Sequence, residues 1–89
     1  MGNKFFVYIL RCSDNTLYTG YTTDFYRRII EHNSGKGAKY TSGRLPCSLV
    51  YLEEYDTKTD ALKREYYIKH KMKREEKLNL INGWRNLHE

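Results

Sequence analysis

Two polar residues at helical spacing could bind a phosphate group. Arg28 and His32 lie four residues apart, in a segment whose apolar residues Phe25 and Ile29 have the same spacing. Residues four apart meet on one side of a helix, so both polar side chains would border that apolar stripe. A guanidinium binds phosphate through paired hydrogen bonds, and an imidazole can hydrogen-bond to a phosphate or a water. The alternative interpretation is that the pair forms only the solvated edge of the helix.

A single carboxylate interrupts an apolar stripe further along the chain. Glu65 has the helical spacing of Ala61, Ile68 and Met72. A carboxylate directed at a core is costly unless it is paired or binds a metal ion. One interpretation is an ion pair with a neighbouring Arg or Lys. The other is a metal ligand, because Mg²⁺ often takes one or two protein carboxylates and completes its shell with water and phosphate oxygens.

Basic residues and a tyrosine gather in residues 33–46, which hold three glycines and the single proline of the chain. Lys36, Lys39 and Arg44 surround Tyr40 there, and the glycines predict a loop. Basic loops interleaved with aromatic residues favour phosphate backbones, whose binding energy comes largely from counterion release. Solvated surfaces have similar composition, so this signal is modest.

The strands that must position these residues follow from the hydrophobic pattern. Runs of β-branched and aromatic residues predict strands over residues 4–11, 16–21 and 48–55. The first run is apolar at both odd and even positions, which is typical of a central strand covered on both faces. The first two strands would form a hairpin. An even register would put Tyr8 and Tyr18 on one face, directly opposite each other in one such pairing, whereas an odd register would separate them.

The helices are predicted by their caps. Asp24 and Thr57 are typical N-caps, and they predict helices over residues 24–32 and 57–72. A last helix is expected over residues 74–82, ending at the glycine that follows. The order β-β-α-β-α-α predicts an α+β fold, with a small, mainly antiparallel three-stranded sheet flanked by helices.

Length and composition limit the class of protein. The 89 residues are enough for one domain, and we expect a single domain over residues 1–89 with its core in about residues 4–82. The net charge is +5 and 15% of the residues are aromatic, which favours a folded, basic, Tyr-rich domain over a disordered chain. The longest apolar run is far shorter than the ~20 residues of a membrane helix, so we expect a cytoplasmic protein. Cys12 and Cys47 are expected to be free thiols rather than a disulfide or a zinc site.

Taken together, these residues resemble the GIY-YIG nuclease superfamily. The segments Val7-Tyr8-Ile9-Leu10 and Tyr18-Thr19-Gly20 are similar to the paired tyrosine motif of that family, and an Arg, a His and a Glu follow in the same order. The resemblance covers roughly residues 5–80 and is strongest to small stand-alone bacterial members. The matching residues are Tyr8, Tyr18, Gly20, Arg28, His32 and Glu65. Where the family usually has an Asn, about a dozen residues after the Glu, this chain has Lys77.

The resemblance implies metal-assisted hydrolysis of a phosphodiester. Glu65 would hold one Mg²⁺ or Mn²⁺ ion, and Arg28 would bind the additional negative charge of the transition state. Tyr8, assisted by Tyr18 or His32, would take the proton of the attacking water. Because a free tyrosine has a pKa near ~10, we expect Arg28, lysines and the metal to lower the pKa of Tyr8. We also expect the five side chains to converge on one concave, electropositive surface.

The resemblance also implies a nucleic-acid partner, with DNA favoured over RNA, and a role in DNA repair or nucleic-acid processing. Gly20 would allow close approach of the backbone to substrate. Lys36, Lys39, Tyr40 and Arg44 would follow the phosphate backbone without reading sequence. A protein partner that supplies specificity is compatible with this scheme. Two alternatives remain: a nucleic-acid-binding module that does not cut, and a protein-interaction domain whose tyrosines belong to the core.

Overall fold

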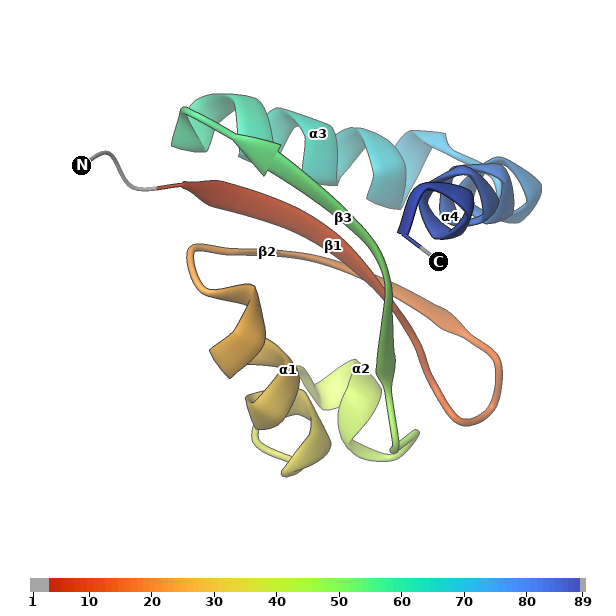
Figure 1. Cartoon of the computed structure of the whole chain (residues 1–89). Coiled ribbons are helices and arrows are strands. Elements are labelled where there is room, and N and C mark those ends of the chain that lie inside the picture. The colour runs from red at the N-terminus through yellow and green to blue at the C-terminus, as the bar shows by residue number, and fades with distance from the viewer. Residues whose placement is uncertain (1–3, 89) are drawn as a thin grey trace.

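A computed structural model describes residues 4–88 of the chain and shows three strands and four helices in that range (Figure 1). The predicted α+β class and element order are confirmed, with one short additional helix. In chain order the elements are β1 (Phe5–Arg11), β2 (Leu17–Thr22), α1 (Phe25–Asn33), α2 (Lys39–Ser42), β3 (Ser48–Tyr55), α3 (Lys58–Lys71) and α4 (Arg74–His88).

The strands form an antiparallel sheet in the order β2-β1-β3. The strand that the sequence predicted to be central is therefore in the middle. Val7, Tyr8, Ile9 and Leu10 in β1 are all buried, because both faces of this strand are covered. The alternation of side chains along β1 divides the interior into two cores, one on each face of the sheet.

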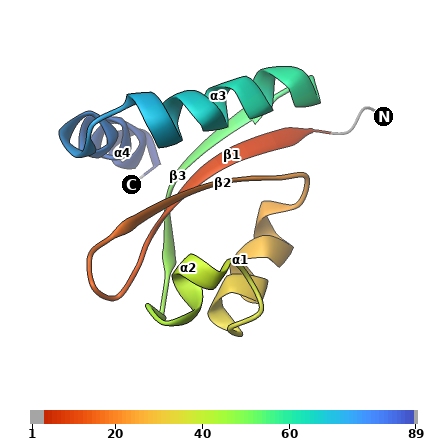
Figure 2. The ribbon, with the colours of Figure 1, turned by 180° about the vertical axis from the view of Figure 1, so that it is seen from behind.

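One core lies under α3 and α4, and the other lies under α1 and α2, as the two opposite views show (Figures 1 and 2). Val7 and Ile9 pack on the first side with Ile68 of α3 and Ile81 of α4. On the second side the buried members, together with the α1 residue that packs against them, are Tyr8, Leu10, Cys12, Cys47 and Ile29. The sheet thus separates the helix that carries Arg28 and His32 from the helix that carries Glu65.

The hairpin register, which the sequence left open, places both motif tyrosines on one face. Tyr8 pairs with Gly20, and Leu10 pairs with Tyr18. Tyr8 and Tyr18 are therefore diagonal neighbours rather than directly opposite each other. Diagonal neighbours on one face are within reach when the side chains are aromatic.

The predicted N-caps of two helices are confirmed. The Asp24 side chain accepts a hydrogen bond from the backbone N–H of Arg27 at 3.1 Å, and the Thr57 side chain accepts one from Asp60 at 3.2 Å. These bonds satisfy N–H groups that have no partner inside the helix. Asp24 thereby fixes the start of α1, and with it the direction in which Arg28 and His32 project.

Two expectations about the helices were wrong. The segment expected to be a loop contains α2, a single turn that begins after Ala38. The last helix does not end at Gly83 but continues to His88. A Cβ atom at Gly83 would meet nothing within 4 Å, so this glycine lies on the open side of α4, while Trp84 packs on the core. A glycine inside a helix costs only about 1 kcal/mol relative to alanine, which this packing outweighs.

The two cysteines are free and adjacent in the structure. The Sγ atoms of Cys12 and Cys47 are 3.2 Å apart, and both residues are buried. Burial raises the pKa of the Cys47 thiol to about 12, so this thiol stays protonated and unreactive at neutral pH. Within residues 4–88, no helix is long and apolar enough to cross a membrane.

Candidate active site

Tyr8 is held by a close approach of two strands. Its ring crosses over Gly20, the residue paired with it on β2: a Cβ atom added at Gly20 would lie 2.3 Å from both Cζ and Oη of Tyr8. A contact of that length is impossible between unbonded heavy atoms, so this ring position requires a glycine. The side chain that Gly20 accommodates is thus Tyr8, and direct contact of Gly20 with nucleic acid stays a prediction.

A chain of buried polar contacts begins at the Tyr8 hydroxyl. Tyr8 Oη is 3.0 Å from His32 Nε2, and His32 Nδ1 is 2.7 Å from Thr41 Oγ1. The Thr41 hydroxyl in turn donates to the carbonyl oxygen of Ala38 at 2.9 Å. Tyr8, His32 and Thr41 are almost fully buried. Strand β1, helix α1 and the short helix α2 therefore meet in one hydrogen-bonded chain.

Tyr18 adds a second aromatic ring to this cluster. Its ring centroid lies 5.2 Å from that of His32 and 6.3 Å from that of Tyr8. On its other side it stacks on Tyr40 of α2, with centroids 5.8 Å apart and planes 30° apart. The Nζ atom of Lys69, from α3, lies 5.6 Å from the Tyr18 ring centre. Tyr18 thus joins the buried tyrosine to an exposed aromatic and basic surface.

The expectation that the pKa of Tyr8 is lowered was wrong for the protein without metal. The pKa of Tyr8 is raised to about 12, mainly because the ring is buried; hydrogen bonding to Arg28 opposes the rise, and the charge of Glu65 adds to it only slightly. Burial also lowers the pKa of His32, and the positive charge of Arg28 adds to that effect. Both groups are therefore neutral at physiological pH.

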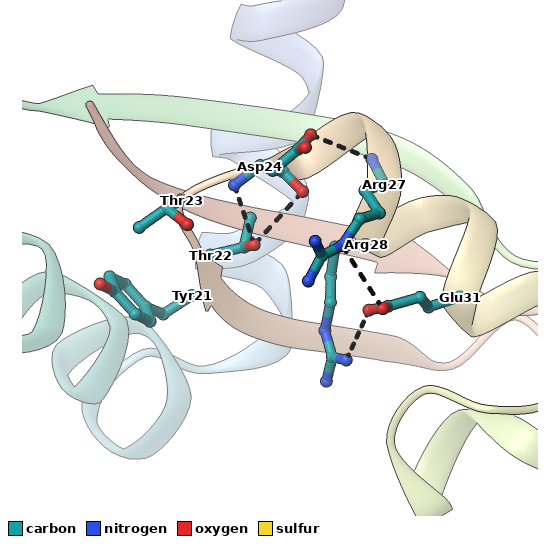
Figure 3. A pocket seen from close by; sticks show the side chains of 7 residues that line it. All are labelled: Tyr21, Thr22, Thr23, Asp24, Arg27, Arg28 and Glu31. Atoms are coloured by element: carbon teal, nitrogen blue, oxygen red, sulfur yellow. Dashed lines mark hydrogen bonds and ion pairs between the residues drawn. The ribbon is translucent and has the colours of Figure 1, made fainter. Parts of the chain in front are cut away.

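Arg28 lies on the open side of this cluster. It lines a cavity of about 310 Å³ between the end of β2 and the start of α1, together with Asp24, Arg27 and Glu31 (Figure 3). The Glu31 carboxylate pairs with both arginines, at 3.2 Å from Arg28 and 3.6 Å from Arg27. Arg28 thus presents its positive charge to the cavity, although the Glu31 carboxylate already pairs with it.

Glu65 approaches the site from the other face of the sheet, along the edge strand β2. Its helix packs on the sheet through Ala61 and Ile68, yet Lys69, one turn after Glu65, reaches the ring of Tyr18. The charge of Glu65 contributes to the raised pKa of Tyr8, as the smallest of the effects that act on it. Glu65 therefore belongs to the same neighbourhood as Tyr8, although α3 lies on the opposite face from α1.

Of the two interpretations of Glu65, the ion pair with a neighbouring Arg or Lys is not found among the described residues. In the described part of the chain, no hydrogen bond or ion pair engages its half-buried carboxylate. The ion pair that links α3 to the sheet is instead that of Arg64 with Glu53 of β3. Residues 4–88 contain no group of three or more metal-ligating side chains. One unpaired carboxylate suits Mg²⁺ or Mn²⁺, which would keep several waters and take substrate phosphate oxygens as further ligands.

The expected basic surface is present but partly neutralised. Lys39, Tyr40 and Arg44 line a broad hollow of about 760 Å³. The Arg44 guanidinium lies 4.5 Å from the Tyr40 ring centre and forms an ion pair with Asp14. Lys36 is exposed and lies outside this hollow.

A smaller cavity of about 320 Å³ continues the surface toward α3 and α4. Tyr18 and Tyr40 form its aromatic wall, and Lys69 and Lys77 contribute positive charge. Lys77, at the position where an Asn was expected from the resemblance, therefore borders the tyrosine cluster. Among the described residues, four of the predicted candidates thus line one path from Arg44 through Lys39 and Tyr40 to Tyr18, with Lys69 and Lys77 beside it.

Comparison with known proteins decides the family. The family model described as the GIY-YIG catalytic domain matches residues 4–79. The chain belongs to the GIY-YIG family. Its two motif tyrosines, Tyr8 and Tyr18, are the residues that the hairpin register brings to one face.

Sequence relatives within the GIY-YIG group extend over most of the chain. The UPF0213 protein YsiG of Lactococcus lactis is 56% identical over 81 residues, which cover 91% of this chain and 78% of that protein. A UPF0213 protein of Halobacterium salinarum is 59% identical over 63 residues, covering 71% of this chain and 82% of the relative. The family assignment thus rests on similarity across the whole site.

Solved structures agree with the fold. The solution NMR structure of the UPF0213 protein BH0048 from Bacillus halodurans is 49% identical and has a TM-score of 0.58, covering 89% of this chain and 83% of that one. The solution NMR structure of protein EF2693 from E. faecalis is 38% identical with a TM-score of 0.62, covering 96% and 92%. Both support the GIY-YIG-like arrangement of sheet and helices.

Sequence reasoning missed four residues of the site. Lys69 and Glu31 carried a usable signal, because they stand four and three residues from Glu65 and Arg28 on the same helices. Lys77 was noticed only as a departure from the family pattern. Thr41 carried no signal, since its position depends on how the segment after α1 folds back over His32.

Proposed function

We propose that this GIY-YIG protein is a divalent-metal-dependent endonuclease that hydrolyses phosphodiester bonds in nucleic acid, with DNA as the favoured substrate. The observation that carries the proposal is the contact between Tyr8 and His32, with Arg28 beside it and the charge of Glu65 acting on it. A role in DNA repair or nucleic-acid processing would suit such an activity.

In this mechanism Arg28 binds the scissile phosphate. The site offers its guanidinium to the cavity of Figure 3, where the incoming phosphate would compete with Glu31 for it. A phosphate oxygen can accept two hydrogen bonds from a guanidinium, and the attraction increases as negative charge develops in the transition state. Arg28 therefore both positions the phosphate and stabilises the transition state.

The proton of the attacking water would pass through Tyr8 to His32. A pKa of about 12 means that ionising Tyr8 in advance at pH 7 would cost about 7 kcal/mol. That cost is avoided if the water proton moves to Tyr8 Oη while the Tyr8 proton moves to His32 Nε2, 3.0 Å away. The water oxygen then bonds to phosphorus as the bond to the leaving oxygen breaks.

Glu65 would hold the divalent ion together with water and phosphate oxygens. A bound ion of this kind neutralises phosphate charge and stabilises the leaving oxygen. The unpaired state of the Glu65 carboxylate and its proximity to Tyr8 support this assignment. Tyr18 would support Tyr8 and His32 by ring packing.

Nucleic acid would follow the path from Arg44 to Tyr18. Lys39, Tyr40 and Arg44 border its outer part, where cations meet phosphates without reading bases. The exposed Lys36 would add charge at a greater distance. Because Arg44 is paired with Asp14, part of its charge is already neutralised before substrate binds.

The competing function is a GIY-YIG module that binds nucleic acid without cutting it. Two features favour this alternative. The raised pKa keeps Tyr8 protonated at neutral pH, and the ion pair with Glu31 occupies the guanidinium of Arg28. Lys77 in place of the usual Asn favours it too. The two functions share the basic path and differ in the need for Glu65.

Cleavage of labelled oligonucleotides separates the two functions. Purified protein would be mixed with single- and double-stranded DNA and RNA in Mg²⁺, in Mn²⁺ and in a chelator. We expect cleavage only with a divalent ion, and a loss of about a hundredfold or more in Glu65→Gln. The matched control is Glu75→Gln, an exposed carboxylate on α4, which should cleave like the wild type.

Binding in the chelator should survive in Glu65→Gln. If the wild type binds but never cleaves, the binding module is correct. Cleavage that is equal in Glu65→Gln and the wild type would come from a contaminant and would remove the support for an enzyme.

A further inference from the structure

In the chain of contacts from Tyr8 through His32 and Thr41 to Ala38, it matters for the proposed reaction which atom donates each hydrogen. Each hydroxyl in the chain has one hydrogen, and the neutral His32 ring has one N–H. Thr41 lies in the middle, 2.9 Å from the Ala38 carbonyl oxygen and 2.7 Å from His32 Nδ1. The location of the Thr41 hydrogen therefore decides the location of the His32 hydrogen.

A carbonyl oxygen can only accept, so the Thr41 hydrogen lies between Oγ1 and the Ala38 oxygen. Without it, two oxygen atoms would face each other at 2.9 Å with lone pairs alone. The short contact on the other side of Thr41 must then use a hydrogen on His32 Nδ1. A neutral ring with Nδ1–H has an unprotonated Nε2, and this nitrogen faces the Tyr8 hydroxyl.

We propose that Thr41 is a positioning residue that holds His32 in the Nδ1–H tautomer, so that Nε2 can accept the proton of Tyr8. The opposite tautomer would place a hydrogen on Nε2, and His32 would then donate to Tyr8 and could not take its proton. The tautomer assignment stands on hydrogen bonds alone, whereas its value for catalysis rests on the proposed function.

The packing around His32 restricts the ring to this arrangement. Gly37 lies against it: a Cβ atom there would be 2.5 Å from Nδ1 and 2.7 Å from Cγ. His32 is fully buried, so no solvent water can replace Thr41 as the acceptor without a rearrangement. The segment from Gly37 to Thr41, including the start of α2, therefore acts as a clamp on one edge of the imidazole.

Two substitutions separate the hydroxyl from the shape of the side chain. Thr41→Val keeps the branched shape and removes the acceptor, while Thr41→Ser keeps the hydroxyl and removes a methyl group. Nitrogen-15 NMR of the histidine rings reports which nitrogen carries the hydrogen, and the His32→Gln spectrum assigns the His32 signals. We expect Nδ1–H in the wild type and in Thr41→Ser, and a shift to Nε2–H in Thr41→Val.

The cleavage assay supplies the second readout. Thr41→Val should cleave at least about tenfold more slowly than the wild type, of the same order as the loss when hydrogen-bond partners of metal-binding histidines are removed, and Thr41→Ser should restore most of the rate. A wild-type spectrum with Nε2–H overturns the assignment even if no variant folds. An unchanged tautomer in folded Thr41→Val overturns it as well.

The two proposals can fail separately. If the wild type shows Nδ1–H but cleaves nothing, the proposed function fails and the assignment of the tautomer survives. If Thr41→Val changes the tautomer and cleaves at the wild-type rate, the positioning role in catalysis is overturned while the nuclease function stands.

Discussion

Replacing Gly20 with alanine tests whether the close approach of β2 to Tyr8 builds the site. The new Cβ atom would lie 2.3 Å from Cζ and Oη of Tyr8, well inside the contact distance of two heavy atoms. Tyr8 is 1% exposed, packed in the core on the α1 and α2 side of the sheet. The ring must therefore shift, and its contact with His32 should lengthen or break.

The size of the effect follows from the crowding. Inserting one methyl group into a packed interior typically costs about 1–3 kcal/mol. In a chain of this size, each kcal/mol lowers the melting temperature by roughly 4–8 °C. The displacement of Tyr8 should also reduce divalent-dependent cleavage by about a hundredfold, as expected when one group that stabilises the transition state is removed.

Thermal unfolding and cleavage of Gly20→Ala would be compared with those of Gly83→Ala. Gly83 lies within helix α4, and a Cβ atom there would meet no other atom within 4 Å. Because alanine favours the helix over glycine, Gly83→Ala should stabilise the protein by up to about 1 kcal/mol. In a Tyr8→Ala background the Gly20 substitution should cost much less, because its steric partner is gone. Wild-type stability and cleavage in Gly20→Ala would refute the argument for a glycine at this position.

Two further predictions concern charge. Changing Lys36, Lys39 and Arg44 together to alanine should weaken nucleic-acid binding and reduce the slope of log K against log salt, by about 0.7–0.9 for each phosphate that the protein no longer neutralises, as a salt titration of binding would show. Burial opposes ionisation of Glu53, but the hydrogen bonds from Arg64 and two tyrosines outweigh it and lower its pKa. A carboxyl group whose pKa is lowered by folding stabilises the folded protein at pH values above its unfolded pKa. This contribution is lost as the pH falls through the folded pKa. When the pH is lowered below about 4.5, the free energy of unfolding should therefore decrease less in Glu53→Gln than in the wild type.

The fold could be predicted wherever the local pattern decides the structure. The doubly apolar run of β1 and the caps Asp24 and Thr57 fixed their elements correctly, because each depends on neighbouring residues alone. The end of α4 could not be predicted, since it depends on how Trp84 packs against the sheet. The hairpin register could not be predicted either, because the turn residues allow several pairings and only the structure shows which one is formed.

The sequence indicated where polar groups gather, whereas their energetics depend on the fold. The spacing of Arg28 and His32, and the carboxylate of Glu65 in an apolar stripe, pointed to side chains that the structure brings into contact with Tyr8 or whose charge acts on it, and their roles in a reaction stay predictions. In the protein without metal, the pKa of Tyr8 is raised rather than lowered, because burial by surrounding elements outweighs the neighbouring arginine. Thr41 was missed for a related reason: its contact with His32 exists only once α2 has formed.

The most direct test of the account is the rate of divalent-dependent DNA cleavage in Tyr8→Phe beside Tyr26→Phe. Each variant removes one phenolic oxygen, but Tyr8 Oη contacts His32, whereas Tyr26 is 72% exposed on α1. If Tyr8 relays the water proton, Tyr8→Phe should fold normally and lose about a hundredfold or more in rate, and Tyr26→Phe should match the wild type. Equal cleavage by both variants would contradict the account, because the hydroxyl at its centre would then have no role in the reaction.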